Sequence, residues 1–373
     1  MSGFAFHVES EPARVTVITA NNTAYELPAL WLRERCQDEA SLDNITQQRL
    51  FNPHNLQDDL SLIAAEARAN NTTWLAFSDG YSCEYDFTKL HADFDLSDGL
   101  PAVKPWKSDF ALSDVTFDWN KVCDQNYRQS SIRAYLTYGM IILRNVPTEK
   151  EQIITVAESY GHVRTTNFGK YFEVYSKPDS NDLAYRPIPL APHTDNPYRD
   201  PVPGIQLLHC LINETNGGLS TLVDSLSVAE QLRCEDPEGF ALLSSVPVRF
   251  QFVDNGIQLT ARRPIIHLNT EGNVTGVHYS PRLDYLPLLD NDTTVKFHRA
   301  RRRFGELASH ADYEIRFPLR AGELMMLDNN RVLHGRTAYD PNGGRRHLQG
   351  CYIDRDGPRG LFKAFNHSTL MSR

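Results

Sequence analysis

Short β-like segments separated by turns are the sequence feature that most limits the fold. From residue 162 onward such segments alternate with Gly, Pro and Asn turns, and only the stretches near 227–243 and 293–308 have helical spacing. The N-terminal part shows the same pattern, including a hairpin signal at Asp79-Gly80. So many strands with so few helices predict a barrel or a double-sheet jelly roll. We therefore expect a mainly β protein with flanking helices.

The length and one irregular stretch predict two domains. The chain has 373 residues, and domains commonly hold about 100–200. Between Leu96 and Phe117 the sequence is rich in Gly, Pro, Ser and Asp without clear periodicity, which is typical of a linker. We predict a small β-rich domain over 1–95, a linker over 96–125 and a larger domain over 126–373.

One helix is predicted early in the larger domain. Thr148-x-x-Glu151 is a capping-box pattern, in which two side chains satisfy the free N–H groups of a helix start. Ile153 and Ala157 then share one face at helical spacing, and Gly161 follows where a C-terminal glycine is expected. The pattern predicts a helix that opens here and ends at Gly161.

Charge and apolar patterning exclude several classes of protein. With 38 Lys+Arg against 47 Asp+Glu, the net charge is −9, which disfavours binding to nucleic acid backbones. The basic run Arg299–Arg303 is interpreted as a solvated helix face. The first residues lack the basic end and apolar stretch of a signal peptide, and no apolar run reaches the roughly 20 residues that cross a bilayer. We expect a cytoplasmic protein with no membrane or nucleic acid partner.

The cysteines indicate neither a disulfide framework nor a four-cysteine zinc site. They are widely spaced and form no CxxC pair, so we interpret them as reduced and mostly buried thiols. The six positions are Cys36, Cys83, Cys123, Cys210, Cys234 and Cys351.

Metal ligands are the remaining place to look for chemistry, because GxSxG, GxxxxGK[ST], GxGxxG and HExxH are all absent from the sequence. His-x-Asp occurs three times, beginning at His91, His193 and His310. On a strand, residues i and i+2 point to the same side, so such a pair can hold one cation. Only the pair His193 and Asp195 has a glycine-rich turn and a distal His and Arg at suitable distances.

The distal residues are His334 and Arg346. His334 follows the apolar run Leu324–Leu327 and is expected on a late strand. Two His and one carboxylate leave three coordination positions open, which is the arrangement of non-haem Fe(II) oxygenases. Arg346 is expected on the neighbouring strand, where its guanidinium could bind a carboxylate bidentately. Other histidines, His209 and His347, are expected to be packed in the protein.

Together these segments resemble the Fe(II)/2-oxoglutarate dioxygenases, and within them the γ-butyrobetaine dioxygenase group. The resemblance is strong over roughly 125–373 and weaker towards the start, where Leu30-Trp31-Leu32-Arg33 is similar to the entry of that group's small N-terminal domain. The matching segments are His193-Thr194-Asp195-Asn196-Pro197, Pro203–Cys210, Gly217-Gly218-Leu219-Ser220, Asp328–His334 and Arg346–Asp354.

The resemblance implies a double-stranded β-helix, or jelly roll, as the catalytic domain. It implies that His193, Asp195 and His334 hold iron, that Arg346 binds the distal carboxylate of 2-oxoglutarate, and that Ser220 lies near this cosubstrate. O2 is the second cosubstrate, ascorbate is a candidate stimulant, and the products are succinate, CO2 and a hydroxylated substrate. A homodimer is the family expectation.

The resemblance also implies an aromatic cage for a trimethylammonium group, since ring faces attract a cation that cannot donate a hydrogen bond. Asp182 is a candidate counter-charge. The matching aromatic positions are Phe168, Tyr171, Phe172, Tyr185 and Tyr352.

Departures from the group concern zinc and the anionic end of the substrate. Relatives bind structural zinc through a cysteine cluster and a histidine, but only Cys36 remains here and Tyr81 lies at the histidine's position, so no zinc is expected. The asparagine that meets the substrate carboxylate is replaced near Ser280-Pro281, and Asn196 replaces an aromatic or Leu. Arg282 lies beside the first of these positions and suits a phosphonate.

These departures favour a similarity to bacterial enzymes that hydroxylate 2-(trimethylamino)ethylphosphonate to its 1-hydroxy product. γ-Butyrobetaine hydroxylation to carnitine is the first alternative. A sulfonate or aryloxyacetate substrate, or a non-catalytic ligand-binding jelly roll, are more remote alternatives.

Overall fold

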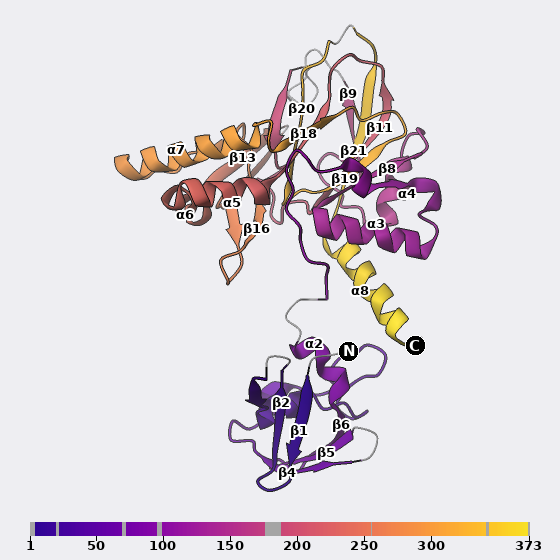
Figure 1. Cartoon of the computed structure of the whole chain (residues 1–373), viewed down its shortest axis with the longest axis vertical. Coiled ribbons are helices and arrows are strands. Elements are labelled where there is room, and N and C mark those ends of the chain that lie inside the picture. The colour runs from indigo at the N-terminus through magenta and orange to yellow at the C-terminus, as the bar shows by residue number, and fades with distance from the viewer. Residues whose placement is uncertain are drawn as a thin grey trace. The chain divides into compact units, whose positions relative to one another are not determined.

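The computed structural model describes residues 4–19, 22–68, 72–94, 99–175, 188–254, 256–340 and 343–371. These residues form two compact units, Met1–Gly99 and Leu100–Arg373 (Figure 1). Among the described helices, none combines the length and the apolar character that crossing a bilayer requires.

The N-terminal unit contains two small antiparallel sheets. One joins β1 (Ala5–Glu9), β2 (Arg14–Ile18) and β3 (Ala24–Glu26), and the other joins β4 (Leu62–Ala67), β5 (Thr72–Phe77) and β6 (Ser82–Asp86). The expected hairpin forms between β5 and β6, and its Gly80 has a φ of 83° that other residues rarely adopt. Helices α1 (Ala29–Glu34) and α2 (His91–Phe94) complete the unit.

Two facing sheets form the larger unit and make it a jelly roll. Except for one pair at the edge of the larger sheet, neighbouring strands in both sheets are not consecutive in sequence, as in a double-stranded β-helix. The six-stranded sheet has the order β7 (Thr116–Asp118), β8 (Met140–Arg144), β19 (Leu324–Asp328), β11 (Ile205–Asn213), β21 (Arg346–Ile353) and β9 (Phe172–Tyr175). The four-stranded sheet has the order β10 (Leu190–His193), β20 (Val332–Arg336), β12 (Ser220–Asp224) and β18 (Glu314–Phe317).

Alternation along the strands assigns each side chain to a layer. On β11, Ile205 and Leu207 belong to a core with the helices, whereas Leu208 and Cys210 belong to a core shared with the four-stranded sheet. Buried apolar strands of this kind need both faces covered. The covering helices are α3 (Gln125–Tyr138), α4 (Gln152–Glu158) and α8 (Asp356–Met371).

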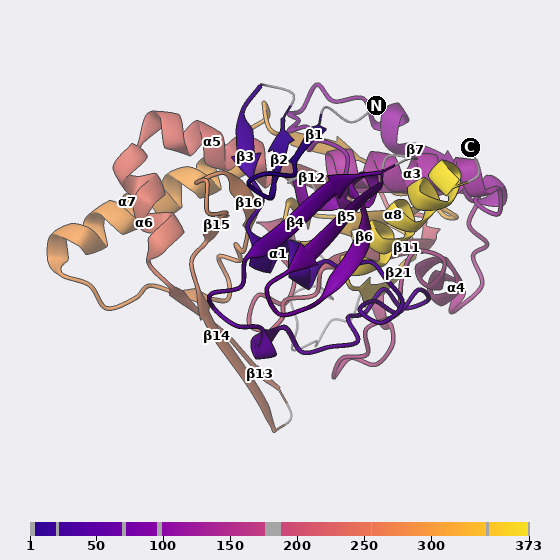
Figure 2. The ribbon, with the colours of Figure 1, turned by 90° about the horizontal axis from the view of Figure 1, so that it is seen from below.

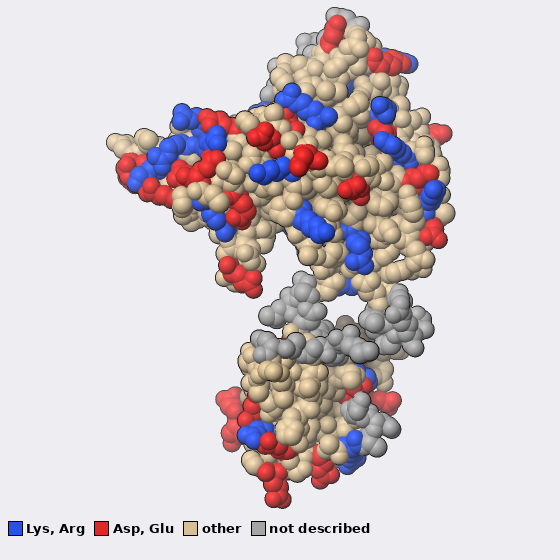
Figure 3. Space-filling view, in the orientation of Figure 1, with Lys and Arg blue, Asp and Glu red and all other residues tan. Residues whose placement is uncertain are grey.

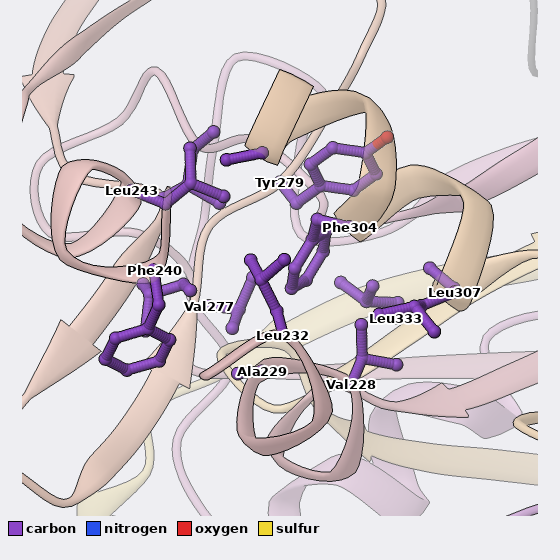
Figure 4. Packing of buried hydrophobic residues seen from close by; sticks show 14 of the residues in the cluster. Val228, Ala229, Leu232, Phe240, Leu243, Val277, Tyr279, Phe304, Leu307 and Leu333 are labelled. Carbon is purple, nitrogen blue, oxygen red and sulfur yellow. The ribbon is translucent and has the colours of Figure 1, made fainter. Parts of the chain in front are cut away.

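A helical insertion between β12 and β18 covers the outer face of the four-stranded sheet. Val223 and Leu333 of that face pack with Val228 of α5 and Phe304 of α7 (Figure 4). In Figure 2 the pair β13–β14 extends from this insertion as a ribbon. The elements are α5 (Ser225–Glu235), α6 (Pro237–Ser245), β13 (Val248–Asp254), β14 (Ile257–Arg263), β15 (Ile266–Leu268), β16 (Val274–Val277), β17 (Asp284–Tyr285) and α7 (Asn291–Ala308).

The basic run on α7 faces acidic side chains. Arg299 pairs with Asp236 at 3.3 Å and Arg303 with Glu235 at 2.7 Å. Figure 3 shows blue and red side chains interleaved over this helical lobe. The run is therefore a solvated helix face with ion pairs, as the sequence indicated.

Two local predictions differ from the structure. The capping box is wrong: α4 begins at Gln152, and Glu151 has a φ of 68° with no side-chain cap, because its backbone N–H donates to Gln349 instead. The helix also ends earlier than predicted, at Glu158, although the N–H of Gly161 donates to the carbonyl oxygen of Ala157 in the turn that follows. In addition, the stretch expected to be an irregular linker contains β7, which pairs in parallel with β8.

Candidate active site

The metal-binding candidates come from two neighbouring strands of the jelly roll. His193 ends β10 and is the direct cross-strand partner of His334 on β20. Oδ1 of Asp195, just after β10, lies 3.2 Å from Nε2 of His193 and 3.7 Å from Nε2 of His334. One nitrogen or oxygen of each residue lies within 4.8 Å of the others, so the three could hold one metal ion.

The protonation of these groups suits a cation. Nδ1 of His193 lies 2.9 Å from the carbonyl oxygen of Ala191 and donates to it, which orients the ring so that Nε2 faces Asp195. Burial, with the charge of His193, lowers the pKa of His334 to about 3, so its ring is neutral at pH 7. Burial opposes ionisation of Asp195, yet the two histidines and Tyr352 hold the pKa of this carboxyl well below its usual value. A neutral imidazole at His334 and an ionised carboxylate at Asp195 are the forms in which these groups bind metals.

Asp195 is held by residues from three other segments. Asn329 accepts from its backbone N–H at 2.8 Å and donates to its carbonyl oxygen at 2.9 Å. Its Oδ2 accepts hydrogen bonds from the Tyr352 hydroxyl at 2.8 Å and from the Gln206 amide. Burial and the Asp195 charge raise the pKa of Tyr352 well above its usual value, so the hydroxyl stays protonated and donates.

An arginine pair lies further along the interior. Arg346 begins β21 and is 8% exposed, and its Nε has no hydrogen-bond partner among the described residues. Arg336 lies two residues after His334 on β20 and so shares its face. Both guanidiniums lie against the ring of Tyr339, at 5.6 and 4.9 Å from its centroid. Burial, then the charge of Arg346, lowers the pKa of Arg336 to about 10. The interior is therefore locally cationic in an acidic protein.

Ser220 lies at the same level of the barrel. It is 2% exposed, begins β12 and is the direct cross-strand partner of Arg336. Gly218, two residues earlier, approaches Arg346 so closely that a Cβ there would lie 3.3 Å from its Nε. The predicted cosubstrate residues Ser220 and Arg346 thus come from the two different sheets, and Gly218 brings the segment before β12 close to Arg346.

Aromatic rings form a series that ends at Asp195. The ring centroids of Phe168 and Phe172 are 6.3 Å apart, and those of Phe172 and Tyr352 are 5.4 Å apart. Phe252 continues the series, 5.8 Å from Phe168, and Tyr198 stacks on Phe252 at 4.9 Å.

Other predicted substrate residues lie in different surroundings. The Tyr171 hydroxyl donates to Glu151 in an exposed position, so this tyrosine is apart from the ring series. Asn196 is buried and lies beside the Tyr352 hydroxyl. Arg282 is exposed, and its charge contributes to the lowered pKa values of both His334 and Arg336. Asp182 and Tyr185 lie outside the described residues.

Sequence reasoning missed Arg336, Gln206 and Asn329. Arg336 could have been found from the two-residue period of a strand, because it follows His334 at i+2. Gln206 and Asn329 carry no such signal, since their roles depend on contacts between segments that only the folded chain creates.

Cysteines that are scattered in the sequence meet in the N-terminal unit. Sγ of Cys36 lies 3.0 Å from Sγ of Cys83, and the Asp38 carboxylate completes a group within 4.8 Å that could hold a metal. The Tyr81 hydroxyl donates to Asp38 at 2.6 Å and lies 2.8 Å from the hydroxyl of Ser41. The absence of zinc stays a prediction.

Comparisons with known proteins give the family of this chain. Residues 102–352 match the family "Taurine catabolism dioxygenase TauD, TfdA family". A γ-butyrobetaine dioxygenase of Pseudomonas sp. is 32% identical over 92% of this chain and 91% of its own length, and a trimethyllysine dioxygenase of Meyerozyma guilliermondii is 27% identical over 88% and 87%. The solved structure of PvcB from Pseudomonas aeruginosa, 18% identical, superposes with a TM-score of 0.49 over 70% of this chain and 94% of that one.

The family match covers most of the larger unit, and the two histidines and the carboxylate lie close enough together to hold one iron(II) ion. The chain therefore belongs to the TauD/TfdA family and is a non-haem iron(II)- and 2-oxoglutarate-dependent dioxygenase.

Proposed function

We propose that this dioxygenase hydroxylates a small trimethylammonium compound, with 2-(trimethylamino)ethylphosphonate as the first choice of substrate. The observation that carries the proposal is the ring series of Phe168, Phe172 and Tyr352, which ends in contact with Asp195. A cation bound by these rings would hold its neighbouring carbon atoms close to the metal. γ-Butyrobetaine and trimethyllysine, named in the relatives, both carry a trimethylammonium group.

Different residues of this chain would hold the iron, the cosubstrate and the substrate. His193, Asp195 and His334 would hold iron(II), which supplies the oxidation when bound with 2-oxoglutarate and O2. Arg346 would bind the distal carboxylate of the cosubstrate, because its buried guanidinium has donors to offer. The rings would orient the substrate and keep water from the reacting carbon.

The anionic end of the substrate would meet Arg282. An exposed arginine, acting alongside buried Arg336, favours a group with more charge and more acceptor oxygens than a carboxylate. This supports the phosphonate, whereas the identity to a γ-butyrobetaine dioxygenase supports the carboxylate alternative.

The deciding experiment compares kcat/KM for 2-(trimethylamino)ethylphosphonate and γ-butyrobetaine, with succinate formation as the readout. We expect the phosphonate to be preferred by at least about tenfold, which is about 1.4 kcal/mol. Arg282→Ala should reduce that preference. A preference for γ-butyrobetaine of similar size would make the alternative correct.

The cage is tested separately by Phe168→Leu, which keeps an apolar side chain but removes the ring face. A desolvated cation–π contact is worth up to about 2 kcal/mol, so we expect KM for the trimethylammonium substrate to rise by about tenfold or more. For an uncharged isostere that carries a tert-butyl group, the same substitution should raise KM much less. If KM does not change, a substrate without a cationic group, such as a sulfonate or an aryloxyacetate, becomes the better hypothesis.

A further inference from the structure

The two oxygens of the Asp195 carboxylate have different surroundings. Oδ1 faces Nε2 of both histidines. Oδ2 faces the opposite way and accepts from Tyr352 and Gln206. One oxygen is thus directed to the metal position, and the other is occupied by protein donors.

The donors come from the sheet opposite the histidines. Gln206 on β11 and Tyr352 on β21 are direct cross-strand partners in the six-stranded sheet. His193 and His334 are direct partners in the four-stranded sheet. Asp195 follows the end of β10, where no strand pairing restrains its side chain, and its carboxylate bridges the two sheets.

Backbone and side chain of Asp195 are restrained by different residues. Asn329 binds the N–H and the carbonyl oxygen, which fixes the peptide but leaves rotation of the carboxylate free. Two hydrogen bonds to Oδ2 remove that rotation, and both donors are buried, with Tyr352 3% and Gln206 2% exposed. Water therefore cannot easily replace either donor.

We propose that Tyr352 and Gln206 form a carboxylate clamp that presents only Oδ1 of Asp195 to the iron and so keeps three coordination positions open. Both are positioning residues: they act on the metal through Asp195. A carboxylate released from the clamp could turn and bind through both oxygens, which would occupy a position needed for 2-oxoglutarate or O2. Hydrogen bonds to ligating groups commonly change metal affinity by about 10–100-fold.

Tyr352 therefore serves two sites at once. Its ring lies next to Phe172 in the proposed cage, and its hydroxyl holds the metal ligand. A cation that settles against this ring would act on the orientation of Asp195 through one side chain. The clamp itself rests on the iron site and is independent of which substrate is bound.

Tyr352→Phe is the decisive variant, because it removes the hydroxyl and keeps the ring. The dissociation constant of Fe(II) is measured anaerobically on metal-free protein by competition with a chromogenic chelator, and KM and kcat are measured on the loaded enzyme. We expect the dissociation constant to rise by about 10–100-fold and kcat to fall, while KM of the substrate stays within about threefold. Gln206→Leu, which also removes a donor, should show the same pattern.

Phe168→Leu is the matched control, since this ring belongs to the same series but has no polar atom that could donate to Asp195. It should raise the substrate KM and leave the Fe(II) dissociation constant unchanged. A cooperative urea-unfolding transition of each metal-free variant shows that the variant is folded. The clamp is refuted if both Tyr352→Phe and Gln206→Leu, folded, bind Fe(II) within about twofold of the parent. A failure of the cage hypothesis would instead appear only in KM of Phe168→Leu.

Discussion

At the scale of single residues, neighbouring side chains in this sequence have opposite surroundings. Arg345 is exposed and pairs with Glu214 at 2.9 Å, whereas Arg346 is 8% exposed and faces the interior. The reason is the two-residue period of β21, which begins at Arg346. A functional role can therefore be tested with the adjacent residue as its control.

Arg346→Gln should raise KM for 2-oxoglutarate by at least about tenfold. The change removes a charge-assisted contact worth about 1.5–3 kcal/mol and leaves a neutral amide in its place. Arg346→Lys should recover part of the loss, because it restores the charge without the bidentate geometry. Steady-state rates at varied 2-oxoglutarate provide the measurement.

Arg345→Gln is the control and should leave KM for 2-oxoglutarate unchanged, since it breaks only an exposed ion pair of about 0–1 kcal/mol. Equal effects of the two changes would mean that Arg346 does not bind the cosubstrate.

The limits of prediction from sequence are also clearest at this scale. His193, Asp195 and His334 could be predicted to meet because their motifs match those of a known family. The strand period was the wrong reason for Asp195, since β10 ends at His193 and Asp195 lies in the bend that follows. Tyr352 was predicted as a cage wall only, since its bond to Asp195 depends on how two sheets face each other. The meeting of Cys36 and Cys83 was missed for the same reason.

At the scale of elements, the pattern of strands predicted the fold correctly, whereas the capping-box motif did not predict the start of α4. The many short strands predicted a barrel or a jelly roll, the family resemblance implied the jelly roll, and both of its sheets are present with buried faces. The capping box at Thr148 and Glu151 failed because Glu151 is held by a contact from distant Gln349. A prediction that rests on a pattern repeated over many strands stays correct when one distant contact intervenes, whereas a prediction from a four-residue motif does not.

Strand β20 lies between β10 and β12, and Gly335 is the residue that lets all three pack. A Cβ at this position would lie 2.5 Å from the carbonyl oxygen of Leu190 and 2.7 Å from the hydroxyl of Thr221. Gly335→Ala should therefore lower the free energy of unfolding by about 1–3 kcal/mol. It should also weaken Fe(II) binding, because β10 and β20 carry the two histidines.

Gly360→Ala is the control for this prediction. Gly360 lies within α8 with open space around its Cβ position, so alanine should stabilise the protein by about 0.5–1 kcal/mol. Urea unfolding of metal-free protein measures both variants. The two substitutions should change the free energy of unfolding in opposite directions. A Gly335→Ala protein as stable as the parent would contradict the packing argument.

At the scale of the whole molecule, the two units differ in what they can bind. All three candidate iron ligands lie in the unit that spans Leu100–Arg373. The other candidate metal group lies in Met1–Gly99, where the Arg33 guanidinium lies 3.7 Å from the centroid of the Tyr81 ring and its charge acts on both thiols. A nearby positive charge opposes a divalent cation, and Tyr81 already donates to Asp38. The units should therefore respond differently to metals.

Calorimetry of the full chain should show this difference as two unfolding transitions. Free Fe(II) at about 100 times its dissociation constant stabilises the unit that binds it by about 2.7 kcal/mol. For a unit of this size that corresponds to a rise in Tm of roughly 5–10 °C. Under anaerobic conditions, only the transition of the larger unit should move, and Asp195→Ala should abolish the shift.

Zinc added to Asp195→Ala should leave the Tm of the smaller unit unchanged. A rise in that transition, lost in Cys36→Ser, would show that Cys36, Asp38 and Cys83 form a metal site and that the prediction of no zinc is wrong.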